Sequence, residues 1–227
     1  MDIKFDKHSL IIDGKREFIR SGAFHYFRSP GYNIALDRFS KMKAMGYNAV
    51  DLYFYWQYHS KKRGEYDFSG LKDVRQVLKA AKDVGLFVIA RPGPFINAEV
   101  NAGGFPLWLL ENKNVIPRNR IGTDYHYSEA YMELMREWYD VIVPIIIEFN
   151  DNVIAFQIEN EYATDSMEED YMRELYKMAR DRGITCINLV TGNISPRGSA
   201  TCHIMIKHCN ALRDCGFGHN IYVFSSE

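Results

Sequence analysis

The sequence has 227 residues, of which 47% are hydrophobic and 25% are charged, and this balance excludes a disordered chain. Its formal net charge is -1, and no block of five or more Lys and Arg occurs, so we expect neither nucleic acid nor a membrane as a partner. The N-terminus lacks an apolar signal-peptide core and no stretch approaches 18 uninterrupted apolar residues, which predicts a cytoplasmic protein.

The predicted elements begin with two short strands, over residues 4–12 and 16–23, around the hairpin dipeptide Asp13-Gly14. The second of these is also a candidate for the first strand of a barrel. Apolar residues at helical spacing then predict helices over residues 34–45, 71–84, 127–149 (with a break near Pro144) and 167–182. Further strands are predicted over residues 49–55, 86–90, 153–157 and 184–190. Residues 91 to about 120 form a loop of a length that is usually functional.

Strict alternation of strands and helices predicts an α/β protein with a parallel sheet of five strands. Such a sheet is either open and doubly wound or part of a (β/α)8 barrel. The sequence has no G-x-G-x-x-G after its first strand and no phosphate-binding P-loop, so the nucleotide-binding forms of the open sheet lose support. We therefore favour a TIM-type barrel that is incomplete, with about five βα units present.

Polar residues cluster where the predicted strands end, which is where barrel enzymes place their reactive groups. Glu159 and Glu161 follow one strand closely, and carboxylates two positions apart in an extended segment point the same way. If both face a cleft, their repulsion and partial burial raise at least one pKa, as a general acid requires. The alternative is a pair of surface loop acids.

Six segments together resemble the catalytic domain of glycoside hydrolase family 35, whose members are mostly β-galactosidases. They are residues 22–28 (GAFHYFR), 41–48 (KMKAMGYN), 64–70 (GEYDFSG), 91–99 (RPGPFINAE), 103–109 (GGFPLWL) and 157–162 (QIENEY). The segments occur in the family's order and approximate spacing over roughly residues 10–185. The resemblance implies hydrolysis of terminal β-D-galactosyl residues by a retaining mechanism, which needs two carboxylates and a water and no cofactor or metal.

The resemblance also implies a role for individual residues. Glu161 becomes the general acid/base, Asn160 the partner of the sugar 2-hydroxyl, and Glu159 a supporting residue. The positions that match the binding of galactose hydroxyls are Tyr53, Asn97, Ala98 and Glu99. The chain departs from the family's usual residues at Gln57, Ser60, Asn97, Val100 and Ala163. A related enzyme acting on another β-linked sugar is therefore an alternative.

Other polar and aromatic residues near the strand ends have two interpretations each. His25 and Tyr26 either touch the sugar or belong to a hydrogen-bonded core. Trp56 and Trp108 form either a sugar-stacking platform or part of the core. For Arg91 we favour pairing with a strand-end carboxylate over contact with substrate.

A retaining glycosidase needs a second carboxylate as nucleophile, and Glu227, 66 residues after Glu161, is the candidate in this chain. We favour instead a truncated or frame-shifted tail, because all four cysteines and only two of the 29 acidic residues lie in the last 42 positions. The domain prediction is a barrel portion over residues 1–186 and an atypical tail over residues 187–227. On that view the chain is inactive or unstable, and the alternative function is that of an inactive, carbohydrate-binding fragment that lacks the nucleophile.

The tail also raises a hypothesis of another class, a zinc site. Its candidate ligands are Cys202, His203, His208, Cys209 and Cys215. Because no pair of cysteines has the short spacing of structural zinc sites, we predict that the chain has no metal site.

Overall fold

The structure is a computed structural model that describes residues 1–5, 9–118, 127–160, 162 and 169–191. The two predicted catalytic residues, Glu161 and Glu227, lie outside this part, as do all five candidate zinc ligands. Within the described residues, no helix is both long enough and apolar enough to cross a bilayer.

The N-terminal segment forms a small antiparallel sheet of β1 (Ile3–Phe5), β2 (Leu10–Ile12) and β3 (Lys15–Glu17). Asp13 and Gly14 join β2 to β3 with φ angles of 47° and 79°, and two successive positive φ angles are the signature of a tight hairpin turn. The predicted hairpin turn is confirmed, but the predicted strand over residues 4–12 is wrong as a single element, because β1 and β2 are separate strands that pair antiparallel. The predicted strand over residues 16–23 is two elements, because β3 ends before β4 (Ser21–Phe24) begins.

Five parallel strands form the main sheet in the order in which they occur in the chain. After β4 come β5 (Ala49–Tyr53), β6 (Phe87–Arg91), β7 (Val153–Asn160) and β8 (Ile187–Thr191). A doubly wound sheet reverses its order at a switch point, whereas the wall of a (β/α)8 barrel does not. Among the described residues the order never reverses, so the predicted α/β class and its five parallel strands are confirmed.

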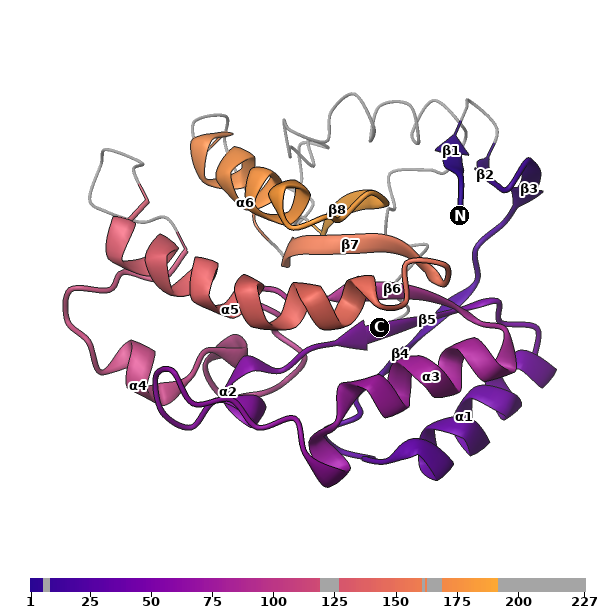
Figure 1. The fold of residues 1–227 in the computed structure, drawn as a ribbon, viewed down its shortest axis with the longest axis horizontal. Coiled ribbons are helices and arrows are strands. Elements are labelled where there is room, and N and C mark those ends of the chain that lie inside the picture. The colour runs from indigo at the N-terminus through magenta and orange to yellow at the C-terminus, as the bar shows by residue number, and fades with distance from the viewer. Residues whose placement is uncertain (6–8, 119–126, 161, 163–168, 192–227) are drawn as a thin grey trace, which may run out of the picture.

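Four long helices connect these strands and pack one against the next in chain order, as Figure 1 shows. They are α1 (Tyr32–Ala44), α3 (Val74–Val84), α5 (Glu129–Ile147) and α6 (Glu169–Asp181). Short α2 (Trp56–His59) and α4 (Leu107–Leu110) and two 3-10 turns, Gly70–Lys72 and Asn101–Gly104, lie in the connections. The long loop after β6 is thus partly ordered into helical turns.

The predicted break at Pro144 is wrong, because α5 runs through this proline without interruption. A proline removes one backbone hydrogen bond from a helix interior. Here the residues around it, Ile142, Val143, Ile145 and Ile146, are all buried. Packing of an apolar face supplies most of the stability of a helix in a protein, and it compensates for the missing bond.

The core is continuous from the N-terminal sheet to α6. Every residue of β5 and β7 is buried, as expected of parallel strands that are covered on both faces. Leu10 and Ile12 of β2 belong to the same buried cluster as the parallel strands. The carboxyl ends of β5, β6 and β7 are therefore held by a packed scaffold.

Candidate active site

Three strand ends meet around the guanidinium of Arg91. Tyr53 closes β5 and pairs in register with Arg91, which closes β6. Arg91 donates hydrogen bonds to the hydroxyl of Tyr53 and, over 2.5 Å, to Oδ1 of Asn160 at the end of β7. Two of the predicted substrate-binding residues are thereby joined through a residue for which we predicted no contact with substrate.

Arg91 also faces a buried carboxylate, as predicted, but this carboxylate lies in the middle of β5 and not at a strand end. Its Nη1 lies 3.7 Å from Oδ2 of Asp51, which is on the same face of β5 as Tyr53 because residues two apart share a face. Burial raises the pKa of Asp51 to about 7, although the charge of Arg91 and a hydrogen bond from Ser21 both act to lower it. Oδ1 of Asp51 has no hydrogen-bond partner among the described residues.

The end of β7 contains an irregularity that decides where its polar side chains point. The register with β8 shifts between Gln157 and Glu159. Gln157 Nε2 donates to Asn160 Oδ1 over 3.2 Å, so residues three apart share a face, which regular alternation does not allow. Bulges of this kind redirect side chains beside active sites. Asn160 is turned toward Arg91 while Glu159 points elsewhere.

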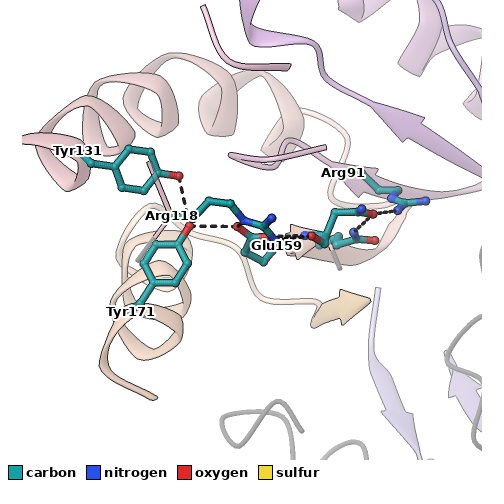
Figure 2. A network of polar contacts seen from close by, with 7 residues as sticks. Arg91, Arg118, Tyr131, Glu159 and Tyr171 are labelled. Atoms are coloured by element: carbon teal, nitrogen blue, oxygen red, sulfur yellow. Dashed lines mark hydrogen bonds and ion pairs between the residues drawn. The ribbon is translucent and has the colours of Figure 1, made fainter. Parts of the chain in front are cut away.

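Glu159 is fully buried and receives hydrogen bonds from three residues. Arg118 binds it with two contacts of 3.0 Å, the hydroxyl of Tyr171 donates over 3.1 Å and the backbone N–H of Asn160 over 2.6 Å. Burial raises its pKa and these donors act in the opposite direction. Figure 2 shows Tyr131 and Tyr171 on one side of Glu159 and Arg91 on the other. The alternative of a surface loop acid is therefore wrong for Glu159.

Residues 97–99 form a left-handed turn beside the same strand ends. Asn97, Ala98 and Glu99 have φ angles of 54°, 49° and 47°, which residues other than glycine seldom adopt and which are often found at functional sites. Arg28 donates to the carbonyls of Ala98 and Glu99 over 2.7 and 3.2 Å. Ala98 is buried in a small cluster with Tyr53, and Glu99 is exposed.

His25 borders this turn. Its ring meets the ring of Tyr53 edge-on at 4.8 Å, and its Nδ1 lies 2.9 Å from Nη1 of Arg28. Nε2 is buried without a hydrogen-bond partner among the described residues. Burial, with the charges of Arg28 and Arg91, lowers the pKa of His25 against the opposing charge of Glu99. The ring is thus favoured in its neutral form.

The remaining aromatic candidates belong to the core. Tyr26 is buried and its hydroxyl lies 2.6 Å from Nε2 of His59. Trp56 is buried and stacks on Trp138 with ring centroids 5.5 Å apart. Trp108 donates from Nε1 to the Ser60 carbonyl. A buried ring has no face for a sugar, so core packing is the correct interpretation for Tyr26 and Trp56.

Sequence reasoning missed two arginines of this region. Arg28 lies inside a quoted family segment, and Arg118 lies in the long loop whose length indicated a function, but neither has a local pattern that predicts its partner. Among the described residues, no group of three or more His, Cys, Asp or Glu could hold a metal ion.

Comparisons with known proteins identify the family of the chain. The family model described as Glycosyl hydrolases family 35 matches residues 9–225, which include positions 187–225, where the sequence showed us no family segment. Probable β-galactosidase C of Neosartorya fischeri is 38% identical over 193 residues, covering 81% of this chain and 19% of that protein. Its counterpart in Aspergillus clavatus is 34% identical over 235 residues, covering 99% of this chain and 22% of that protein. The chain thus spans about a fifth of the length of these relatives.

A solved structure supports the fold independently. An exo-β-1,4-mannosidase from Opitutaceae bacterium strain TAV5 superposes with a TM-score of 0.66 at 17% identity, covering 85% of this chain and 35% of that one. The parallel sheet therefore corresponds to part of a glycosidase barrel. With the family match over nearly its whole length, the chain belongs to glycosyl hydrolase family 35.

Proposed function

We propose that this chain carries the acid/base part of a retaining β-galactosidase, in which Glu161 protonates the glycosidic oxygen and later activates water. The observation that supports this most is the fixed orientation of Asn160. Its Oδ1 accepts from both Arg91 and Gln157, so the oxygen is committed to the protein. Nδ2 is then the atom that would donate to the 2-hydroxyl of the sugar, a contact that strengthens in the transition state of glycoside hydrolysis.

The reaction requires a second carboxylate about 5–5.5 Å from the first, which attacks the anomeric carbon and forms a covalent glycosyl intermediate. Glu227 remains a prediction for this role, and it lies outside the described residues. Because the chain spans only part of its relatives, a carboxylate from a longer form of the protein is the alternative. The chain would then bind sugar without hydrolysing it.

The proposed sugar-binding group consists of Tyr53, Asn97, Ala98, Glu99 and Asn160. The exposed carboxylate of Glu99 is suited to accept hydrogen bonds from two hydroxyls and to sense their orientation. His25 stands beside it with a buried Nε2. A terminal β-galactoside is the proposed substrate, and another β-linked sugar is the alternative that the departures at Asn97 and Val100 favour.

Hydrolysis of p-nitrophenyl β-D-galactoside by the purified 227-residue chain tests the proposal. Wild type is compared with Glu161→Gln, Glu227→Gln and, as a matched surface control, Glu111→Gln, whose parent side chain is exposed. Loss of turnover in both of the first two variants would identify Glu227 as the nucleophile. Full turnover in a folded Glu161→Gln variant would contradict the acid/base assignment.

Calorimetric titration with galactose separates the enzyme from the binding fragment. Binding without turnover would identify the inactive, carbohydrate-binding form, and the activity would then belong to a longer protein. Parallel titrations with glucose and mannose test the alternative sugars. A chain that is folded by circular dichroism but neither binds nor hydrolyses any of these sugars would contradict the proposal.

A further inference from the structure

Arg118 contacts the strand end at which the proposed acid/base is attached. It lies in the loop between β6 and α5, has a φ of 68°, and extends its side chain to β7. Nε and Nη2 hold the two oxygens of Glu159, and Nη2 also donates to the backbone carbonyl of Asn160 over 2.8 Å. That carbonyl belongs to the peptide group that joins Asn160 to Glu161.

Aromatic side chains fix the guanidinium in place. Its central carbon lies 4.1 Å from the ring centroid of Phe95 and 5.3 Å from that of Tyr162. Phe95 in turn packs directly on Gly103, where an added Cβ would lie 1.8 Å from the ring. Only a residue without a side chain allows the Phe95 ring to lie this close. The loop therefore holds the Phe95 ring against Arg118.

We propose that Arg118 is a positioning residue for the general acid/base, because it holds the backbone carbonyl of Asn160, the residue to which Glu161 is joined. A peptide group is planar, so fixing its carbonyl oxygen restricts the torsion angles on both sides of it. The hydroxyl of Tyr171 on α6 donates a hydrogen bond to the same Glu159 carboxylate. This contact connects the end of β7 to α6 as well. This inference rests on the role proposed above for Glu161.

A second arginine shows what a purely structural pair looks like. Arg75 binds Glu148 through two contacts of 2.7 and 2.6 Å, and both side chains are about half exposed. Both contacts go to the carboxylate oxygens of Glu148 and not to a backbone carbonyl. Buried ion pairs seldom stabilise a fold more than apolar residues of the same volume would. The additional contact of Arg118 with the Asn160 carbonyl therefore indicates orientation as its role.

The activity test compares Arg118→Met, Arg118→Lys and the control Arg75→Met on p-nitrophenyl β-D-galactoside. Misplacement of a reacting group by about 1 Å lowers rates on the order of 10²-fold, so we expect that loss in kcat for Arg118→Met, with KM changed by less than about threefold. Arg118→Lys keeps the charge, so its kcat should lie between those of wild type and Arg118→Met. The control should match wild type. A folded Arg118→Met variant with wild-type kcat would overturn the proposal.

Amide hydrogen exchange tests the same contact without any sugar. In Arg118→Met the amides of Asn160 and Glu161 should exchange about tenfold faster or more, while those of β5 stay unchanged. Unchanged exchange at both amides would overturn the proposal. Absence of sugar binding and turnover in the wild-type chain would instead refute the proposed function, and the exchange result would still show whether Arg118 holds the end of β7 in place.

If Arg118→Met does not fold, the double variant Arg118→Met/Glu159→Met takes its place. It removes the unpaired buried carboxylate that would otherwise unfold the chain. We expect the double variant to fold and to show the same fast exchange and low kcat. A folded double variant with wild-type exchange and kcat would overturn the proposal.

Discussion

Two buried carboxylates, Asp51 and Glu159, face the two arginines that contact Asn160 and are held very differently. Asp51 has one arginine nitrogen at 3.7 Å, a hydrogen bond from Ser21 and an oxygen without a hydrogen-bond partner among the described residues. Glu159 has two arginine contacts of 3.0 Å, a tyrosine and a backbone N–H. Burial raises the pKa of both. Burial thus sets the direction of the shift, and the donors decide how well the ionised form is tolerated.

The two arginines that face these carboxylates hold different parts of Asn160. Arg91 contacts its side-chain oxygen and Arg118 its backbone carbonyl. Asp51, through Arg91, therefore supports the side chain of Asn160, which would hold the sugar. Glu159, through Arg118, supports the backbone of Asn160, which leads to the proposed acid/base. Each of four substitutions disrupts the surroundings of one of the two carboxylates and leaves those of the other intact.

The largest effect is expected from Arg118→Met, which leaves Glu159 buried without its arginine. Breaking a buried ion pair from one side costs about 3–5 kcal/mol, so the free energy of unfolding in urea at pH 8 should fall by about that amount. The double variant Arg118→Met/Glu159→Met should recover most of the loss. A decrease below about 1 kcal/mol in the single variant would mean that Glu159 does not depend on Arg118.

Gly103→Ala should break the support of Arg118 without touching Asp51. The new Cβ would lie 1.8 Å from the Phe95 ring at a φ of +60°, and overpacking together with backbone strain costs about 3 kcal/mol. Gly64→Ala is the matched control, since Gly64 has a φ of +77° and nothing within 4 Å of the added atom. Its cost should be about 1 kcal/mol of backbone strain alone. Equal losses in urea unfolding would contradict the packing at Gly103.

Asp51→Asn should change how stability depends on pH. The folded state keeps the Asp51 proton up to about pH 7, whereas the unfolded chain releases it near the ordinary value of 3.8. Stability from this group is therefore present at low pH and is lost as pH rises through that window. The Asn variant lacks this loss, so its stability relative to wild type should rise by about 2 kcal/mol between pH 5 and pH 7. A constant difference between the two proteins would show that Asp51 titrates normally.

The smallest effect is expected from Tyr171→Phe, which removes one of the donors to Glu159 and its 3.2 Å contact with the hydroxyl of Tyr131. A hydrogen bond to a charged group contributes about 1.5–3 kcal/mol, so the unfolding free energy should fall by about 1.5 kcal/mol. Tyr176→Phe on the same helix is the control and should stay within about 0.5 kcal/mol of wild type. Identical stabilities for the two variants would contradict the role of Tyr171.

Much of the scaffold follows from local sequence patterns. The helix predicted to end at residue 84 does so, and Gly85 follows α3 with a φ of 74°. The strand ends place Tyr53, Arg91 and Asn160 together because parallel strands finish at one edge. The bulge in β7 and the partner of Arg118 were not predictable, since both depend on contacts between distant segments. Arg118 and Glu159 are 41 positions apart.

Other sequence predictions stay untested. The roles of Glu161 and Glu227 and the zinc hypothesis fall on residues that the structure does not describe. The division at residue 186 and the cytoplasmic location also remain predictions. The family match extends through residue 225. A structure of a longer form of the protein would test the predicted division at residue 186.

A crystal structure of the 227-residue chain with bound galactose tests the central claim most directly. The account predicts the sugar at the ends of β5, β6 and β7, with its 2-hydroxyl at hydrogen-bond distance from Nδ2 of Asn160 and with Oδ1 still on Arg91. Its other hydroxyls should contact Tyr53 and Glu99. Galactose bound elsewhere, or an Asn160 whose amide is reversed toward Arg91, would contradict the account.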